Sequence, residues 1–418
     1  MNSENFNNLP SIESYIGSDR WSGITRKYTS ADIQKLRAPF TTVSPISERG
    51  AKKLWSLLND GDQFISGLGA ATTQQALQMY NLDYEFIYVS GWQVAAESNG
   101  GTNTYPDLSL YPSDSGPKFI EKINNTLLRK MIELDKGTIP PIIADAESGF
   151  GGVYNVFEIT SQFIRSGISG LHFEDQLASE KKCGHMGGKV VIPTHEYINK
   201  LTSARLASDV FGSPIILIAR TDSLNAKLMT SDFDERDEPY LSTKRTPDGY
   251  YPIKNNHEMA ITKSLAYSEF ADVIWCETNT PDLGFAEEFA TEIKRNYPDK
   301  ILAYGKAGTV GLNGEIEHAS AFIHTLRFGN KFRDAVGGTS YLSFTNTRGP
   351  AGSKISIPMM HKTDSGLRPY YLTHEFTIHD APFDDEIVIA IGGASSGRAH
   401  ARTGDRYQDM KEMGLDPK

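Results

Sequence analysis

The chain has 418 residues, of which 39% are hydrophobic and 22% are charged, and its formal net charge is −10. This length suffices for one large barrel with an extra module or for about two to three ordinary domains, and the composition excludes a globally disordered chain. The acidic balance argues against nucleic acid or an anionic membrane surface as the main partner.

The cysteine content and the start of the chain bear on the compartment. There are two cysteines, Cys183 and Cys276, and the first residues do not resemble a signal peptide. No apolar run approaches the ~20 residues that span a bilayer. We therefore expect a protein of the reducing cytoplasm that does not enter a membrane.

The first three-quarters of the chain alternate between apolar runs and helix-like segments. Residues 1–45 are polar and irregular, and we expect an arm that packs on the main body or on a neighbouring subunit. A helix is predicted from residue 47 to residue 58. Seven short apolar runs follow at residues 64–66, 86–89, 141–144, 171–173, 215–218, 273–275 and 301–303. Continuous apolar strands that alternate with helices predict a parallel sheet covered on its outer face.

Polar residues stand where five of these runs end. They are Ser90-Gly91-Trp92, Asp145-Ala146-Glu147, Glu174-Asp175, Arg220-Thr221-Asp222 and Glu277-Thr278. Charges can simply cap strands where loops begin. Five in succession instead favour a (β/α)₈ barrel, in which the carboxyl ends of the strands meet at one mouth that holds the active site.

Four acidic residues are candidates for a metal site at this mouth. Asp145 and Glu147 are two residues apart, Glu174 follows the next strand, and Asp107 lies in a Tyr-Pro-Asp loop. Converging carboxylates repel one another unless a cation neutralises them. Oxygen ligands favour Mg²⁺, or Mn²⁺, over zinc. The alternative is a set of surface acids that lysines neutralise.

A glycine-rich loop carries a candidate proton donor. Its sequence is Lys181-Lys182-Cys183-Gly184-His185-Met186-Gly187-Gly188-Lys189. Cationic neighbours stabilise a thiolate, so we expect a lowered pKa for Cys183. The glycines let the backbone approach a ligand closely. The alternative is a solvated basic loop with an incidental cysteine.

Together these groups suit the cleavage of a carbon–carbon bond next to a hydroxyl group. Arg220 has a planar fork that matches a carboxylate. Ser90, Gly91 and Trp92 can supply hydroxyl and backbone donors beside the metal. A metal polarises the hydroxyl and the incipient carbonyl, and a thiol protonates the carbanion that remains.

Residues from about 10 to 304 resemble isocitrate lyase in its shorter, bacterial-type form. The segments that carry the resemblance are Ser90-Gly91-Trp92-Gln93-Val94-Ala95-Ala96, Tyr105-Pro106-Asp107, Ala144-Asp145-Ala146-Glu147-Ser148-Gly149-Phe150-Gly151-Gly152, Phe173-Glu174-Asp175-Gln176, Lys181-Lys182-Cys183-Gly184-His185, Ile218-Ala219-Arg220-Thr221-Asp222, Thr230-Ser231-Asp232-Phe233-Asp234-Glu235-Arg236-Asp237 and Trp275-Cys276-Glu277-Thr278. That family splits isocitrate into glyoxylate and succinate with Mg²⁺.

The resemblance implies a role for each matching residue. Asp145 would bind the metal directly, and metal-bound waters would be held by Asp107, Glu147 and Glu174. The glyoxylate part would be bound by Ser90, Gly91, Trp92 and Arg220. Cys183 would protonate the succinate carbanion, with Gly184 and His185 near the succinate part. Glu277 matches a catalytic position of the family whose role is less defined.

The chain departs from the family after the seventh strand. Isocitrate lyases continue with an Asn-Cys-Ser-Pro-Ser-type segment that binds the succinate carboxylate, whereas here Tyr304 is followed by Gly305-Lys306-Ala307. From about residue 304 the tail is weakly similar to the end of the "amino acid synthesis" family. It has one amphipathic helical segment, at about residues 314–335. β-like runs follow at residues 341–344, 355–359, 370–378 and 386–391, and a glycine-rich turn at residues 392–397.

We therefore predict an α/β fold, a (β/α)₈-type (TIM-like) barrel of the isocitrate lyase/phosphoenolpyruvate mutase type. Its eighth strand and C-terminal helices are expected to be missing or replaced by a β-rich tail. The predicted parts are an N-terminal arm (1–45), a lyase-like barrel (46–304) and a divergent α+β module (305–418).

The predicted function is Mg²⁺-dependent cleavage of isocitrate, or of a close 2-hydroxy polycarboxylate, by a homo-oligomer. The alternatives are methylisocitrate cleavage, oxaloacetate hydrolysis, or an impaired homologue that binds Mg²⁺ and small dicarboxylates without turnover.

Overall fold

The computed structural model describes most of the first 305 residues and five later strands. The described residues are 11–38, 44–59, 64–81, 83–99, 107–135, 137–184, 186–278, 282–305, 341–343, 357–363, 366–372, 378–379 and 387–388. The predicted helix near residues 314–335, the glycine-rich turn at 392–397 and His185 lie outside them.

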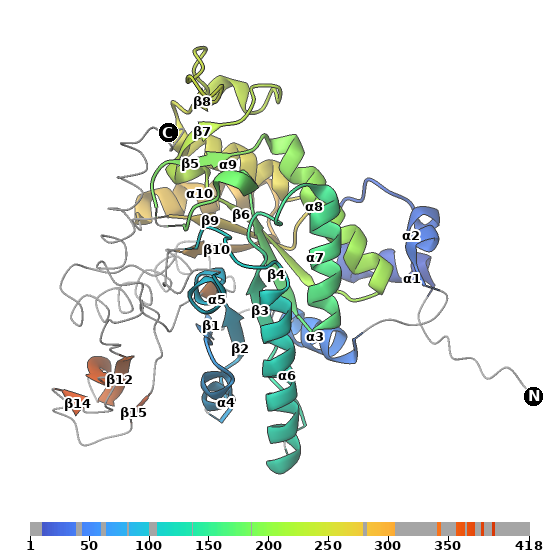
Figure 1. Cartoon of the computed structure of the whole chain (residues 1–418), viewed down its shortest axis with the longest axis vertical. Coiled ribbons are helices and arrows are strands. Elements are labelled where there is room, and N and C mark those ends of the chain that lie inside the picture. The colour runs from blue at the N-terminus through green and yellow to red at the C-terminus, as the bar shows by residue number, and fades with distance from the viewer. Residues whose placement is uncertain are drawn as a thin grey trace, which may run out of the picture.

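A closed barrel of eight parallel strands forms the centre of the protein (Figure 1). The strands are β1 (Phe64–Gly69), β2 (Phe86–Val89), β3 (Ile142–Asp145), β4 (Gly170–Glu174), β6 (Ile216–Thr221), β9 (Val273–Glu277), β10 (Ile301–Gly305) and β11 (Tyr341–Ser343). They follow one another around the barrel in the order β1, β2, β3, β4, β6, β9, β10 and β11. The seven predicted strands are all present, so the predicted barrel is confirmed.

The eighth position in the barrel is occupied by a strand from the tail. β11 pairs in parallel with β1, where Phe64 lies opposite Tyr341 and Ser66 lies opposite Ser343. On its other side, Tyr341 lies opposite Leu302 of β10. The sequence pattern predicted a β-like run at residues 341–344 but did not identify it as the eighth barrel strand. In the structure the tail supplies this strand, so the barrel is closed.

Helices pack against the barrel strands. They are α3 (Pro45–Asn59), α4 (Thr73–Asn81), α5 (Gly91–Ser98), α6 (Ser115–Glu133), α7 (Val153–Arg165), α8 (Thr194–Phe211), α9 (Asn256–Tyr267) and α10 (Leu283–Asn296). In α7 the buried positions Val156, Ile159, Phe163 and Ile164 recur at helical spacing, which gives one apolar stripe. Figure 1 shows α7 and α8 side by side. Helix α8 ends at Gly212, whose left-handed φ of 64° suits a glycine cap.

The barrel interior is apolar below and charged at its mouth. Side chains two apart on a strand face the same side, so Ile216, Ile218 and Arg220 follow one another up the inner face of β6. Val273, Trp275 and Glu277 do the same on β9. An inner cluster joins these apolar residues to Leu54 and Leu58 of α3. Because every second residue faces inward, the last inward residue of a strand, such as Arg220 or Glu277, lies at the mouth of the barrel.

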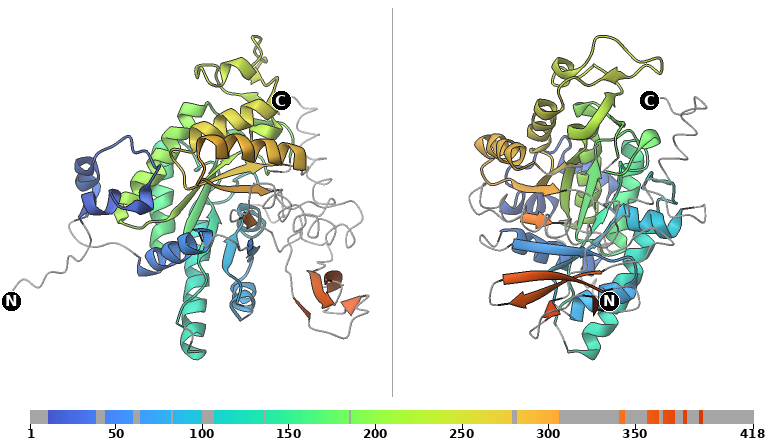
Figure 2. Two further views of the ribbon diagram at one scale, coloured as in Figure 1. Left: turned by 180° about the vertical axis from the view of Figure 1, so that it is seen from behind. Right: turned by 90° about the vertical axis from the view of Figure 1, so that its left-hand side faces the viewer.

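Two smaller sheets stand outside the barrel. A three-stranded sheet consists of β5 (Lys189–Val191), β7 (Ala226–Met229) and β8 (Tyr251–Pro252). Figures 1 and 2 show it at the opposite end of the long axis from α6. An antiparallel sheet in the tail has the order β14 (Ile378–His379), β13 (Gly366–Leu372), β12 (Ile357–Thr363) and β15 (Ile387–Val388). These four strands overlap the later β-like runs of the sequence.

The N-terminal segment is joined to the barrel by an ion pair with a buried aspartate. It contains α1 (Ile12–Ile16) and α2 (Ser30–Leu36), and between them Arg20 contacts Asp272 at 2.7 Å. Arg205 of α8 contacts the same carboxylate at 2.5 Å, and the backbone N–H of Leu217 donates to it at 2.8 Å. Although burial opposes ionisation, Arg20 and Arg205 lower the pKa of Asp272. The proposed boundary at residue 45 stays a prediction.

Replacing Asp272 with asparagine is expected to lower the free energy of unfolding by about 3–5 kcal/mol, because Arg205 is buried and would lose its anionic partner. The folded-state pKa of Asp272 lies below its ordinary value of 3.8. The ionised Asp272 therefore contributes fully to stability above pH 3.8, and this contribution is lost as the pH falls through the folded-state pKa. Urea unfolding at pH 7 and in acid measures both effects.

The matched control is Glu48→Gln, which breaks an exposed pair with Lys52 in α3 and should change stability little. Equal stability losses in the two variants at pH 7 would contradict the assignment of Asp272 as a buried junction.

None of the described helices combines the length and apolar character needed to cross a membrane.

Candidate active site

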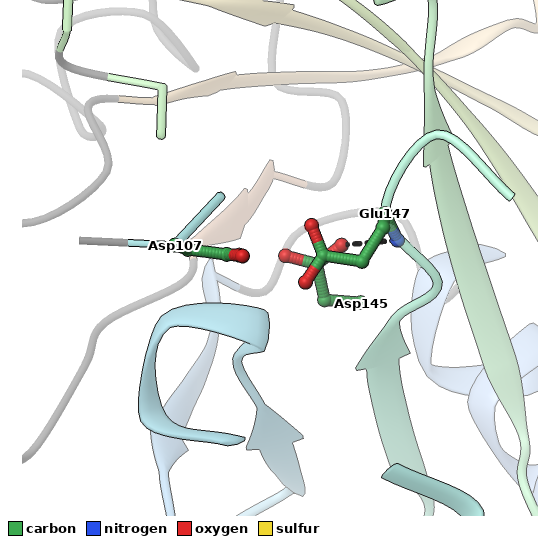
Figure 3. Close-up of side chains that lie close together, drawn as sticks. All are labelled: Asp107, Asp145 and Glu147. Atoms are coloured by element: carbon green, nitrogen blue, oxygen red, sulfur yellow. Dashed lines mark hydrogen bonds between the residues drawn. The ribbon is translucent and has the colours of Figure 1, made fainter. Parts of the chain in front are cut away.

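Three buried carboxyl groups converge at the barrel mouth. Asp145 is the last residue of β3, Glu147 follows it in a turn, and Asp107 comes from the loop before α6. Each offers an oxygen, and these three oxygens lie within 4.8 Å of one another (Figure 3). The backbone N–H of Glu147 donates to Asp145 at 2.8 Å. Glu147 has a left-handed φ of 57°, a strained conformation that turns its side chain back toward Asp145.

Gly91 provides the space for this cluster. It begins α5, and its backbone N–H donates to Asp145 at 3.2 Å. A Cβ atom at position 91 would lie 2.3 Å from Glu147, 2.5 Å from Asp107 and 2.7 Å from Asp145. Only glycine therefore allows the backbone to approach all three carboxyl groups. The neighbouring Ser90 and Trp92 are buried, and the Trp92 Nε1 donor has no partner among the described residues.

Lys181 contacts two of these acids, Asp107 and Glu147, and also Glu174. Its Nζ lies 2.7 Å from Asp107 and 3.7 Å from Glu174. The alternative of surface acids neutralised by lysines does not apply as stated, because Lys181 and its three partners are all buried. Glu174, the fourth predicted metal-site residue, lies beside this lysine but outside the cluster of three.

Burial and charge shift the pKa values of these groups in different directions. Burial, reinforced by Asp107, raises the pKa of Glu147 well above its ordinary value. Burial also raises the pKa of Glu174, to about 8. For Asp145 burial acts upward, but neighbouring cationic groups win and its pKa is lowered. His172 contacts Asp145 at 3.5 Å, and burial lowers its own pKa to about 4. Among the groups that lower the pKa of Asp145, His172 has the largest effect, followed by Lys181 and Arg220.

Arg220 lies between three carboxylates at the mouth. Its guanidinium contacts Glu174 at 3.1 Å, Asp222 at 3.0 Å and Glu277 at 3.8 Å. It is 4% exposed, and the ring of Trp275 lies beneath it at 5.0 Å. These acids raise the pKa of Arg220 despite its burial. The guanidinium is thus a permanent cation at the centre of the mouth.

The cysteine loop reaches into the same site. Cys183 is 5% exposed, and the charges of Lys181, Asp107, Arg220 and Glu277 lie near enough to affect the pKa of its thiol. A Cβ atom on Gly184 would lie 2.0 Å from a Glu277 oxygen and 2.7 Å from Arg220 Nη2. The loop backbone therefore packs directly on these two side chains.

The predicted lowering of the Cys183 pKa is wrong. Burial raises the pKa of this thiol to about 12, and it outweighs the opposing effects of Lys181 and Arg220. The thiol is therefore protonated at neutral pH, which suits a proton donor better than a thiolate nucleophile.

Most of the predicted site residues are brought together. Among the described residues they are Ser90, Gly91, Trp92, Asp107, Asp145, Glu147, Glu174, Cys183, Gly184, Arg220 and Glu277. Their roles as ligands or catalysts stay predictions.

Sequence reasoning missed three side chains around the acids. Ser109 donates to Glu147 at 2.9 Å, and the Tyr111 hydroxyl also donates to it. His172 lies between Asp145 and Tyr88, whose hydroxyl is 3.0 Å from its Nε2. Their spacing in the sequence could have identified them. Ser109 and Tyr111 follow Asp107 at intervals of two residues, and His172 precedes Glu174 by two.

Comparisons with known proteins identify two families that match different parts of the chain. The sequence profile of the isocitrate lyase family matches residues 8–244, and that of the "Amino acid synthesis" family matches residues 274–404. The second match begins inside β9, earlier than the change predicted near residue 304.

A solved structure of oxaloacetate acetylhydrolase with 3,3-difluorooxalacetate aligns with a TM-score of 0.49 and 25% identity, over 72% of this chain and 80% of that chain.

Curated isocitrate lyases are similar over most of their length. The Escherichia coli K12 enzyme is 48% identical over 298 residues, 68% of this chain and 69% of that protein. The Corynebacterium efficiens enzyme is 45% identical over 306 residues, 71% of each chain. Isocitrate lyase 1 of Mycobacterium tuberculosis is 47% identical over 292 residues, 68% of each chain. With a profile match over more than half of its residues and relatives at this identity, the chain belongs to the isocitrate lyase family.

Proposed function

We propose that the protein is a Mg²⁺-dependent carbon–carbon lyase that cleaves isocitrate, or a close 2-hydroxy polycarboxylate, to glyoxylate and succinate or the corresponding acid. The observation that carries this proposal is the convergence of three buried carboxyl groups beside Arg220 and the Cys183 thiol at one barrel mouth. Family membership supports a lyase, and the substrate and the metal are the proposed parts.

The donor set fits a hard divalent cation. Its members are carboxylate oxygens, and Gly91 adds no Cβ atom to the space between them. Asp145 would bind Mg²⁺ or Mn²⁺ directly, and Asp107, Glu147 and Glu174 would hold its water ligands. A bound dication polarises the substrate hydroxyl and the carbonyl that forms from it.

The remaining residues would bind the substrate and move protons. Arg220 would pair with a substrate carboxylate, and Ser90, Gly91 and Trp92 would hold the glyoxylate part. The bond between the hydroxyl-bearing carbon and its neighbour breaks as the hydroxyl loses its proton, for which Glu277 is our candidate acceptor. The electron pair left on the neighbouring carbon then takes a proton from the Cys183 thiol, which yields succinate.

An aldehyde-trapping assay tests this proposal. The protein is incubated with Mg²⁺ and isocitrate, 2-methylisocitrate or malate-like acids, and the released 2-oxo acid is trapped and measured. Release of glyoxylate from isocitrate supports the proposal. If none of these substrates releases a 2-oxo acid, the lyase proposal fails.

Replacing Asp145 with asparagine is expected to weaken Mg²⁺ affinity at least about tenfold, because the cluster loses the carboxylate whose pKa is already low. Calorimetric titration of the metal measures the change. The control is Asp114→Asn, which alters an exposed carboxylate paired with Lys118 and should leave the affinity unchanged. Turnover that persists in a strong chelator would contradict the metal assignment.

A second candidate is a protein that binds Mg²⁺ and small dicarboxylates without turnover. The family profile ends at residue 244, and the Ser-Pro-Ser segment expected to hold succinate is absent after Tyr304. Calorimetry with glyoxylate and Mg²⁺, beside the cleavage assay, separates the two candidates, since binding without product favours the second. The cytoplasmic location and the homo-oligomer stay predictions.

A further inference from the structure

A fully buried lysine links the cysteine loop to the arginine of the mouth. Lys189 begins β5 and has no exposed surface. Its ammonium group lies 2.5 Å from Asp222 and also donates to the backbone carbonyl of Gly184. Burying an ammonium group is unfavourable unless its partners compensate, so these contacts fix its position.

We propose that Lys189 is a positioning residue, which holds the Cys183–Gly184 backbone and the Asp222–Arg220 pair in the single arrangement that cleavage needs. This inference deepens the proposed function and rests on it.

Lys189 affects Arg220 through their shared partner Asp222. Asp222 accepts hydrogen bonds from Arg220 Nε at 3.0 Å and Nη2 at 3.1 Å, and its second cationic partner is Lys189. Glu174 and Glu277 also contact the Arg220 guanidinium. Without the charge of Lys189, Arg220 would have to balance more of the Asp222 charge and would be less available to a substrate carboxylate.

Lys189 also restrains the backbone beside the Cys183 thiol. Cys183 lies between two tethers of the loop backbone. On one side, the side chain of Gln176 donates to the Lys182 carbonyl at 2.8 Å and accepts from the Lys182 N–H at 2.9 Å. On the other side, Lys189 holds the Gly184 carbonyl. Because Gly184 packs on Glu277 and Arg220, the second tether fixes the thiol relative to the groups that bind substrate.

Lys263 provides a matched control. It is also fully buried, contacts Asp175 at 3.7 Å and Asp237 at 3.9 Å, and donates to the Ile192 carbonyl. None of these partners belongs to the cysteine loop. Asp175 is joined to Asp222 through the Asp222 backbone N–H, at 2.8 Å, and not through the Asp222 carboxylate that pairs with Arg220. A Lys→Met change at either position removes a buried ammonium and keeps a similar shape. A difference in thiol reactivity between the two variants therefore reports the positioning role of Lys189 and not a general loss of stability.

The experiment measures how fast dithionitrobenzoate modifies Cys183 in the folded full-length protein without substrate, with mass spectrometry to separate it from Cys276. Lys189→Met is expected to speed modification about 10- to 100-fold over wild type, because the loop next to the thiol loses the charge-assisted hydrogen bond that holds its backbone. Lys263→Met should stay near the wild-type rate. Loss of a cation disfavours the thiolate, so faster modification reports exposure rather than a lower pKa.

Equal modification rates in the two variants would overturn the proposal. So would faster modification in Lys189→Met with kcat and KM both unchanged in an active protein. If Lys189→Met does not fold, Lys189→Met/Asp222→Asn removes both charges together, and a thiol as protected as in wild type would likewise reject the inference. The modification rates do not depend on turnover, so failure of the lyase proposal and failure of the tether are distinguishable.

Discussion

Replacing Cys183 with serine should lower kcat for isocitrate cleavage by about 10²–10⁴-fold, the usual contribution of a general acid. The thiol is protonated at neutral pH because burial raises its pKa to about 12. A serine hydroxyl has nearly the same shape but is a much weaker acid, so proton transfer to the carbanion slows while substrate binding persists. Rates of glyoxylate release at saturating isocitrate and Mg²⁺ measure the effect.

The control for this variant is the other cysteine. Cys276 lies on β9 with its side chain in the core outside the barrel interior, so Cys276→Ser should keep near-normal turnover. A loss in Cys183→Ser that appears only as a raised KM would point to substrate binding rather than proton transfer. Near-normal kcat in Cys183→Ser would remove this thiol from the proposed mechanism.

The strands and the charged mouth were predictable because both follow from local pattern. Apolar runs such as residues 215–218 can only be satisfied by burial on both faces, which specifies a central parallel strand. Once the strands are placed, their period of two brings Asp145, Glu174, Arg220 and Glu277 to the same end of the barrel. The sequence therefore carried most of the candidate site.

What the sequence could not supply is the partner of each charge. Lys181 is two residues from Cys183, which suggested that it lowers the thiol pKa. In the fold the Lys181 ammonium contacts Asp107 and Glu147, and burial has the larger effect on the Cys183 pKa, which it raises. Lys189 and Asp222 are far apart in the chain, and no local pattern pairs them. Desolvation and long-range pairing both depend on tertiary structure.

The closing strand was hidden for the same reason. Residues 341–344 have a β pattern, but it does not say whether they join a barrel or a separate sheet. The pairing of β11 with both β1 and β10 decides this, and it lies in a region that matches a different family.

A chain that ends at residue 305 is expected to lose cooperative unfolding and all cleavage activity. Removing β11 leaves the facing edges of β1 and β10 without partners and opens the inner core, which includes Ile301 and Ala303, to water. Unpaired parallel strands with apolar faces aggregate readily, so we also expect poor solubility. Circular dichroism during urea unfolding and sedimentation of the purified protein measure both outcomes.

The control is a chain that ends at residue 388, because it keeps every strand that the structure describes. It should unfold cooperatively near the full-length midpoint. A point variant tests β11 alone: Leu342→Pro removes a backbone donor from the strand, whereas Leu342→Ala keeps it, so proline should destabilise the barrel far more. A 305-residue chain that unfolds cooperatively at the full-length midpoint would show that the barrel closes without the tail. The tail would then have to be explained by something other than the stability of the lyase-like fold.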